Sequence, residues 1–378
     1  MENLKRKTME FHSFNFLALH FKLLIGIVVI LAIIVAIFAL ARLDVTGSKG
    51  SGLSDQFVYD VKDLAKIDPN LILYEETGPP ISTGFTNACG LAVGPQGSIY
   101  VAGDRAIRRF SESGQILTEI ELADTPGCLT ITDDGKIYIG IKEHVEIYDR
   151  GGKRLTGWQS LGDNAVLTSI AVSKDDVFVA DAGNRIVLRY DMTGKLLNRI
   201  GQKDPQRDIP GFVIPSPYFD LAVAHDGLLR VTNPGRHRIE AYTFDGDLEF
   251  WWGNSCFRRN DVTPAKAGVS SDLQDFCGCC NPVNFAILDD GSFVTCEKGL
   301  TRVKIYSREG VFVGIVAGTE QLLEGGAARI GMLPGQRQAG GFDVAVDSRG
   351  RIFVLDTIKN TVRIFARKIE AQSNKGTK

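Results

Sequence analysis

The sequence contains few of the residues and motifs on which common enzymes depend. Among its 378 residues there are 5 histidines, and only His144, His225 and His237 lie beyond the N-terminal apolar stretch. No Ser-His-Asp arrangement can be placed, no glycine-rich phosphate loop follows a strand and opens a helix, and no C-x-x-C-H haem motif occurs. These absences exclude several enzyme classes and leave open whether the protein is an enzyme.

An excess of basic charge is also missing. The formal net charge is −2, and no run of Lys and Arg occurs beyond the N-terminal segment. Binding to a polyanion needs clustered basic residues, so a nucleic-acid partner is not expected. Glycine, in contrast, is abundant at 41 residues, which suits a fold with many tight turns.

One long apolar run lies near the N-terminus. Residues 23–41 carry no charge, and a helix of that length crosses about 30 Å of hydrocarbon. A cleaved signal peptide is the alternative, because Ala39-Leu40-Ala41 resembles a cleavage site, but signal peptides have shorter apolar regions. We therefore expect a single N-terminal transmembrane helix, with the membrane as a partner of residues 23–41.

The flanking charges predict how this helix is oriented. Lys and Arg are more frequent before the span than after it, at Lys5, Arg6, Lys7 and Lys22 against Arg42 and Lys49. The positive-inside rule places residues 1–22 in the cytoplasm and the rest outside, in the periplasm of a Gram-negative cell. Residues 42–69 read as a linker, 70–368 as the folded domain and 369–378 as a polar tail.

The folded domain repeats one unit six times. Each copy has an apolar run, a turn ending in Gly or its equivalent, a β-rich run, a polar break, and a further run that ends in Tyr or Phe. The copies begin at Gly90, Cys128, Thr168, Asp220, Asn284 and Asp343. Six copies of a four-strand unit near forty residues long predict an all-β fold, a six-bladed β-propeller.

The unit resembles the NHL repeat family. The matching features are the Gly-Leu-Ala-Val or Asp-Val-Ala-Val start, the Ile-Tyr-Val-Ala run, Asn184-Arg185-Ile186 and the Gly-Lys-Leu-Leu ending. The resemblance covers residues 72–367 and implies the propeller fold. Members of the family mostly bind proteins or RNA and a few are enzymes, so the resemblance leaves the activity open.

The sixth copy lacks its fourth strand. The β-rich run at residues 71–74 has no hairpin partner, and we expect it to complete the sixth blade. Such a closure leaves no major unpaired sheet edge.

Three connections between blades are much longer than the others. They are residues 202–217, 254–282 and 317–340, and each joins the last strand of one blade to the first strand of the next. Such connections emerge at one end of a propeller, so we expect an inserted face around blades 4–6 that binds an envelope protein. Simple tolerance of long loops is the alternative.

Cysteines gather at the second of these insertions. The candidates for disulfides or metal ligation are Cys256, Cys277, Cys279, Cys280 and Cys296. In an oxidising compartment a disulfide from Cys256 to Cys277 or Cys279 is favoured. The alternative is a metal or redox site that holds zinc, iron or a cluster on the last four, although Cys-x-Cys-Cys matches no common ligand spacing.

A second set of candidates begins the innermost strands. Asp220, Asn284 and Asp343 occupy one repeat position in three adjacent blades, where converging oxygens would suit calcium. This would permit a calcium-dependent hydrolase or lactonase, whereas a plain role in capping backbone amides is favoured.

Glu297 and Lys298 follow Cys296 and depart from the other copies. They are further ligand-binding candidates for the channel, with an ion pair in a loop as the alternative. A binding platform on the inserted face remains the leading prediction, since no catalytic set emerges.

Overall fold

The computed structural model describes residues 24–33, 35, 66–256, 263, 265–278, 280–323 and 341–369. By their internal contacts, the chain divides into two units, Met1–Tyr59 and Asp60–Lys378. In the first unit, residues 24–33 and 35 are helical. No helix within the described ranges is both long and apolar enough to cross a membrane. The expected span 23–41 lies partly outside the described residues, and residues 1–22, 42–65 and 370–378 lie wholly outside them.

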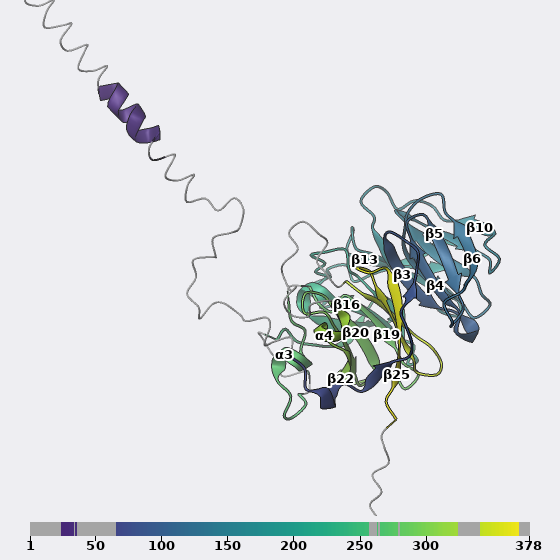
Figure 1. Ribbon diagram of the computed structural model, residues 1–378. Helices are drawn as coiled ribbons and strands as arrows, with labels where there is room; N and C mark the ends of the chain where they lie inside the picture. Colours follow the sequence, from purple (N-terminus) through teal and green to yellow (C-terminus); the bar gives the residue numbers. More distant parts are fainter. Residues whose placement is uncertain are drawn as a thin grey trace, which may run out of the picture. The chain divides into compact units, whose positions relative to one another are not determined.

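The second unit is built from six antiparallel sheets, one for each repeat (Figure 1). Blade 1 contains β3 (Ala88–Val93), β4 (Ile99–Gly103), β5 (Ala106–Phe110) and β6 (Ile116–Glu121). Blade 2 contains β7 (Pro126–Ile131), β8 (Ile137–Ile141), β9 (His144–Tyr148) and β10 (Arg154–Gly157). Blade 3 contains β11 (Leu167–Val172), β12 (Asp176–Asp181), β13 (Ile186–Asp191) and β14 (Leu196–Ile200).

The remaining blades follow the same order. Blade 4 contains β15 (Leu221–Val223), β16 (Leu229–Asn233), β17 (Arg238–Tyr242) and β18 (Leu248–Trp252). Blade 5 contains β19 (Asn284–Ile287), β20 (Phe293–Glu297), β21 (Arg302–Tyr306) and β22 (Phe312–Ala317). Blade 6 contains β23 (Asp343–Val346), β24 (Ile352–Asp356) and β25 (Thr361–Arg367), with β1 (Tyr74–Glu76) and β2 (Ile81–Ser82) on its outer side.

The first strands of the six blades form a closed ring. Each contacts the first strand of the next blade, and β23 of blade 6 contacts β3 of blade 1. The predicted six-bladed propeller is therefore confirmed. Short elements at the connections are the 3-10 turns η2 (Pro69–Leu71), η3 (Pro95–Gly97) and η4 (Pro234–Arg236) and the helices α3 (Ser271–Gln274) and α4 (Thr319–Leu322).

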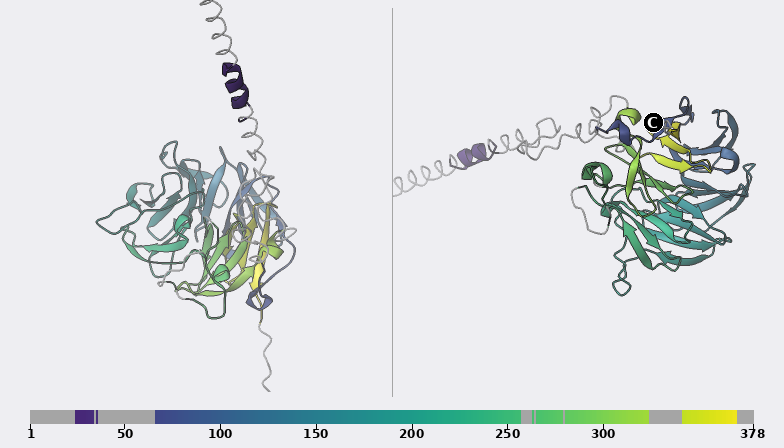
Figure 2. Two further views of the ribbon diagram at one scale, coloured as in Figure 1. Left: turned by 90° about the vertical axis from the view of Figure 1, so that its left-hand side faces the viewer. Right: turned by 90° about the horizontal axis from the view of Figure 1, so that it is seen from below.

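The N-terminal segment closes blade 6, as expected, but with a shifted strand. Tyr74 lies opposite Arg367, so the pairing strand is β1 (Tyr74–Glu76) instead of residues 71–74. Ile72 forms a parallel bridge with Ile315 of β22, so the preceding residues join blade 5. In both further views (Figure 2), the C-terminal strands in yellow lie beside the N-terminal strands in dark blue.

The three insertions do more than extend the surface. In the first, Ile209, Phe212 and Ile214 are buried in one cluster with side chains of blades 3 and 4. Their burial removes apolar area from water at the junction of two sheets, which stabilises the ring. The insertion therefore packs between the two blades as well as connecting them.

The other two insertions repeat this pattern at the next junctions. Leu273 of α3 and Phe276 pack in a cluster with Trp252 of blade 4 and Phe293 of blade 5. At the junction of blades 5 and 6, Leu322 of α4 is fully buried in a further cluster, with Leu323 beside it. Much of the apolar content of the described insertion residues thus serves packing between blades.

Candidate functional site

The short loop between β20 and β21 meets all three insertions. This junction loop, residues 298–301, begins with Lys298, whose Nζ donates to Ser216 Oγ of the first insertion at 2.8 Å. Asn281 of the second insertion accepts from the Lys298 backbone N–H at 2.9 Å and donates to its carbonyl oxygen at 3.0 Å. Thr319 of the third insertion donates to the Thr301 carbonyl at 3.1 Å. The three insertions are therefore connected through one loop.

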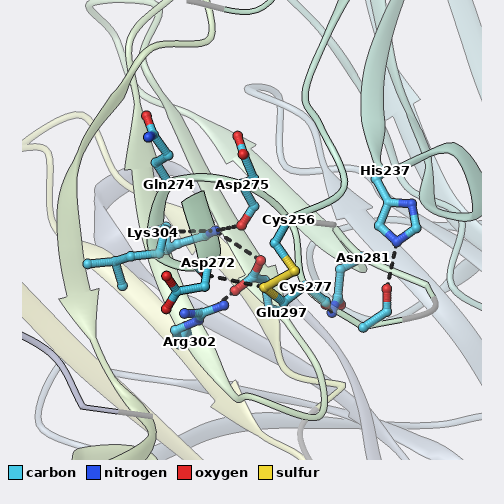
Figure 3. The surroundings of a disulfide bond; sticks show 12 residues. His237, Cys256, Asp272, Gln274, Asp275, Cys277, Asn281, Glu297, Arg302 and Lys304 are labelled. Carbon is cyan, nitrogen blue, oxygen red and sulfur yellow. Dashed lines mark hydrogen bonds and ion pairs between the residues drawn. A yellow bond between two sulfur atoms is a disulfide. The ribbon is translucent and has the colours of Figure 1, made fainter. Parts of the chain in front are cut away.

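The corresponding loop of blade 4 joins two of the insertions. The Gly235 N–H donates to the carbonyl oxygen of Val213, in the first insertion, at 2.9 Å. His237 Nε2 lies 2.6 Å from the Gly278 carbonyl oxygen of the second insertion (Figure 3). Because Val213 remains 40% exposed, this part of the face presents apolar surface beside polar loop groups.

A buried ionic cluster lies beneath the second insertion (Figure 3). Glu297 Oε2 accepts from Arg302 Nε at 2.8 Å, and Glu297 Oε1 lies 2.9 Å from Lys304 Nζ. None of the three side chains is exposed. Burial lowers the pKa of Lys304 to about 8, partly opposed by the nearby Glu297 carboxylate. A charge pair in such a place needs good geometry, since desolvation of each ion costs several kcal/mol.

The cationic end of this cluster holds the insertion in place. Lys304 Nζ also donates to the carbonyl oxygens of Leu273 and Asp275, at 3.2 and 2.8 Å. The Tyr306 hydroxyl donates to the Gln274 carbonyl at 2.9 Å. Carbonyls at a helix end have no partner within the helix, so blade 5 supplies donors for the end of α3.

The cysteines take the disulfide arrangement that the sequence favoured. Cys256 and Cys277 form a disulfide with their Cα atoms 5.2 Å apart, and it closes the second insertion (Figure 3). Cys280 and Cys296 are buried, and Cys279 lies outside the described residues. Burial raises the pKa of the Cys296 thiol, which disfavours a thiolate there.

The described parts of the chain contain no group of three or more His, Cys, Asp or Glu side chains placed to bind one metal ion. The proposed four-cysteine metal site at Cys277, Cys279, Cys280 and Cys296 gains no support, because Cys277 is in the disulfide. The calcium site expected at Asp220, Asn284 and Asp343 stays a prediction, because one of its ligands would be an amide oxygen.

These three residues do line the central channel. The first strands enclose a cavity of about 350 Å³, and Asp220, Asn284 and Asp343 are among its lining residues. Glu297 and Lys298 are not among the described residues that line it. Their expected channel placement is therefore corrected: Glu297 lies in the ionic cluster and Lys298 in the junction loop.

The channel residues also connect neighbouring blades. Asp220 Oδ2 accepts from the Phe285 N–H of blade 5 at 2.8 Å, and Asp343 Oδ2 accepts from the Leu91 N–H of blade 1 at 2.7 Å. Asn284 Nδ2 donates to the Phe342 carbonyl at 2.7 Å. The amide-capping role that the sequence favoured is present, but it acts across blade junctions.

The two channel carboxyls have raised pKa values. Burial raises the pKa of Asp220 to about 6, although hydrogen bonds from Ser169 and from backbone amides oppose the shift. Burial, and then the nearby Asp220 carboxyl, raise the pKa of Asp343 to about 7. The channel thus holds two acidic groups that resist being charged together.

Sequence reasoning missed two members of the ionic cluster, Arg302 and Lys304. Glu297 was noticed, but the partner expected for it was its neighbour Lys298. A signal was present: the middle residue of the third strand is Glu146 in blade 2, Glu240 in blade 4 and Lys304 in blade 5. A charged residue at one inward position of several repeats indicates a buried polar cluster.

The fold is similar to several solved structures. A streptogramin B lyase aligns with a TM-score of 0.53 and 12% identity, covering 80% of this chain and 100% of that one. A gluconolactonase from Xanthomonas campestris aligns with a TM-score of 0.52 and 16% identity, covering 80% and 96%. A protein of unknown function from Bacteroides thetaiotaomicron aligns with a TM-score of 0.57 and 15% identity, covering 78% and 73%.

Identities this low show the fold alone. No family model matches the chain, and no curated protein matches it. The propeller architecture that the NHL resemblance implied is supported by these structural matches and by the six sheets.

Proposed function

We propose that this protein is a membrane-tethered binding platform, in which the inserted face around blades 4–6 engages a partner protein in the cell envelope. The observation that carries the proposal is the junction loop. Side chains or backbone of residues 298–301 bond to Ser216, Asn281 and Thr319, one from each insertion. Loops that vary freely need no such shared anchor, whereas a binding surface benefits from being rigid before its partner arrives.

The chemistry of the face also suits a protein partner. Val213 is an exposed apolar residue, and the exposed Arg236 of the blade 4 loop donates to the Pro210 carbonyl of the same insertion at 3.4 Å. Apolar anchors with Arg nearby are typical of protein–protein interfaces. Residues 23–41 provide the tether in this proposal, and the charges around them support a propeller outside the cytoplasm.

Site-specific photo-crosslinking in cells tests the platform. A benzophenone amino acid is placed at Val213 of the full chain, and a matched one at Leu155, which is 48% exposed on the outer strand of blade 2. We expect a discrete adduct from position 213 and none from position 155. In a Lys298→Met background, which removes the bond to Ser216, the adduct should weaken at least severalfold while the melting curve stays cooperative.

Two outcomes would contradict the proposal. Equal adducts from positions 213 and 155 would show that other proteins contact the propeller without preferring the inserted face. An adduct at position 213 that is unaffected by Lys298→Met would show that the junction loop does not organise the surface. The tether is tested separately: the full chain should stay with membranes after an alkaline carbonate wash, and a chain lacking residues 1–41 should not.

A lactonase activity is the second reading that the sequence left open. The similarity to a gluconolactonase, at 16% identity, supports a common fold and does not extend to activity. The described His, Cys, Asp and Glu side chains form no group of three or more placed to hold a metal ion, and no observation favours calcium chemistry over binding.

A further inference from the structure

The central cavity has an unusual charge content. It is lined by residues from the first strands of all six blades and by Pro217, Tyr218 and Gly341 near the strand starts. Asp220 and Asp343 are the only charged residues among them. No Lys, Arg or His lines the cavity, so both carboxyls face it without a basic counterpart from the described residues.

A basic group, that of Lys298, contacts one of the residues that line the cavity. Its ammonium lies 4.8 Å from the centre of the Tyr218 ring and donates to Ser216 Oγ, but Lys298 itself does not line the cavity. Tyr218 is thus the side chain that the cavity and Lys298 share. The charge of the cavity therefore comes from Asp220 and Asp343, at the starts of the first strands of blades 4 and 6.

The hydrogen bonds present occupy only some of the lone-pair positions with which the Asp220 and Asp343 carboxyls can accept. Asp220 accepts from the N–H groups of Leu221 and Phe285 and from Ser169, and Asp343 accepts from the N–H groups of Val344 and Leu91. A carboxylate offers about four lone-pair positions, so each retains room for a further donor. Both side chains are half-buried, which leaves part of each in contact with the cavity.

The size of the cavity limits what enters it. About 350 Å³ lies at the lower end of the roughly 300–1,000 Å³ range of ligand pockets. Calcium prefers roughly six to eight oxygen ligands, and the carboxylate and amide side chains among the described lining residues, Asp220, Asn284 and Asp343, fall short of that number. An alkylammonium needs only about three acceptors and an apolar wall for its carbon chain. Leu91, Val223 and Ile287 are among the apolar residues that line the cavity.

We propose that the central cavity binds a small organic cation, a primary ammonium, with Asp220 and Asp343 as its counter-ions. The cavity adjoins the inserted face at Tyr218, which Lys298 contacts, but this proposal is carried by the channel carboxyls and not by the partner surface. Its ligand is selected by positive charge and small size, because the described lining residues supply two acids and no base.

Three probes of equal carbon chain test this proposal on the purified full chain. n-Propylammonium, 1-propanol and propionate are titrated separately, and binding is followed by calorimetry and ligand-observed NMR. We expect saturable binding of one n-propylammonium per chain, with the alcohol about tenfold weaker and the propionate weaker still. Asp220→Asn and Asp343→Asn should each weaken ammonium binding about tenfold.

Asp133→Asn is the matched control, because it removes the same charge from an exposed turn of blade 2. It should leave the affinity unchanged. Equal binding of ammonium and alcohol, no binding of the ammonium, or calcium alone occupying the cavity would each overturn the proposal. If the channel variants fail to fold, the proposal is tested by whether the parent chain binds n-propylammonium more tightly than 1-propanol and propionate.

Discussion

Blades 4 and 5 build their polar clusters on the same frame but place the acid differently. In blade 4 the acid is Glu240, in the middle of the third strand, and it accepts from Asn233, Arg238 and Tyr242. In blade 5 the acid is Glu297, at the end of the second strand, and the middle of the third strand is Lys304.

The register makes these positions equivalent. Asn233 lies opposite Arg238 in blade 4, and Glu297 lies opposite Arg302 in blade 5. In blade 4 the tyrosine donates to the carboxylate within the blade. In blade 5 the tyrosine and Lys304 donate instead to backbone carbonyls of the second insertion. In blade 4 the cluster contacts an insertion through the bond from the Val213 N–H to Asn233 Oδ1 at 3.0 Å, whereas in blade 5 Lys304 and the tyrosine both donate to the insertion. Moving one acid therefore strengthens the attachment of the cluster to an insertion.

The largest expected effect comes from removing that attachment. Lys304→Met keeps the bulk of the side chain but leaves Glu297 with one cation and removes the donor to the Leu273 and Asp275 carbonyls. Breaking a buried ion pair by removing one partner costs about 3–5 kcal/mol. Urea unfolding should show this loss, and limited proteolysis should cut the second insertion faster.

The matched change in blade 4 is Glu240→Gln. It should cost about 1–3 kcal/mol, because hydrogen bonds to a buried group are lost while Arg238 stays stacked on Trp251. Proteolysis of the insertion should not change. If Glu240→Gln loosens the insertion as much as Lys304→Met does, the two blades do not differ in the way described.

The disulfide provides a second attachment of the same insertion. Replacing Cys256 and Cys277 together by Ser removes a cross-link with a sequence separation of 21 residues, worth about 3 kcal/mol in the chain-entropy description. Thermal unfolding of the double variant should show the loss, and a reducing agent should reproduce it in the parent chain. A reducing agent that leaves the parent unchanged would show that the insertion is held by the ionic cluster alone.

The smallest effect is a pH dependence confined to blade 5. The pKa of Lys304 is about 8 in the folded protein against an ordinary value of 10.5, so its protonated form weakens folding below pH 8. That penalty is relieved as pH rises from 8 toward 10.5, by at most about 1.4 kcal/mol per unit. Urea midpoints at pH 7.5, 8.5 and 9.5 should show the parent gaining stability relative to Lys304→Met, and a constant difference would contradict the assignment.

The repeat made the fold predictable, down to the closure of the ring. The turn residues located the hairpins in the sequence, as at Gly291, which has a φ of 83°. Residues 71–74 were placed at the right blade, but the pairing strand is Tyr74–Glu76. The shift arises because the N–H of Leu73 donates to Ile315 of blade 5 at 2.9 Å, and a lone β-rich run does not reveal which of two edges it joins.

The site was less predictable, because insertion residues have no equivalent positions in other blades from which their location could be predicted. Phe212 and Phe276 occupy no repeat position, so nothing in the sequence showed that they would fill the junctions between blades. The channel placement of Asp220 and Asp343 followed from the repeat register and was found. Lys298 was noticed because it departs from the other copies, but its role in joining insertions depends on Ser216, which no spacing rule connects to it.

The outer edge of blade 6 also determines when the protein can finish folding during synthesis. Glu76 pairs with Arg363, a residue that leaves the ribosome 287 positions later. Each of the first five blades can form as its own strands emerge, but the ring stays open until the last strand is released. The N-terminal strand therefore waits with an unpaired edge throughout translation, which makes this stretch the natural place for a chaperone to act.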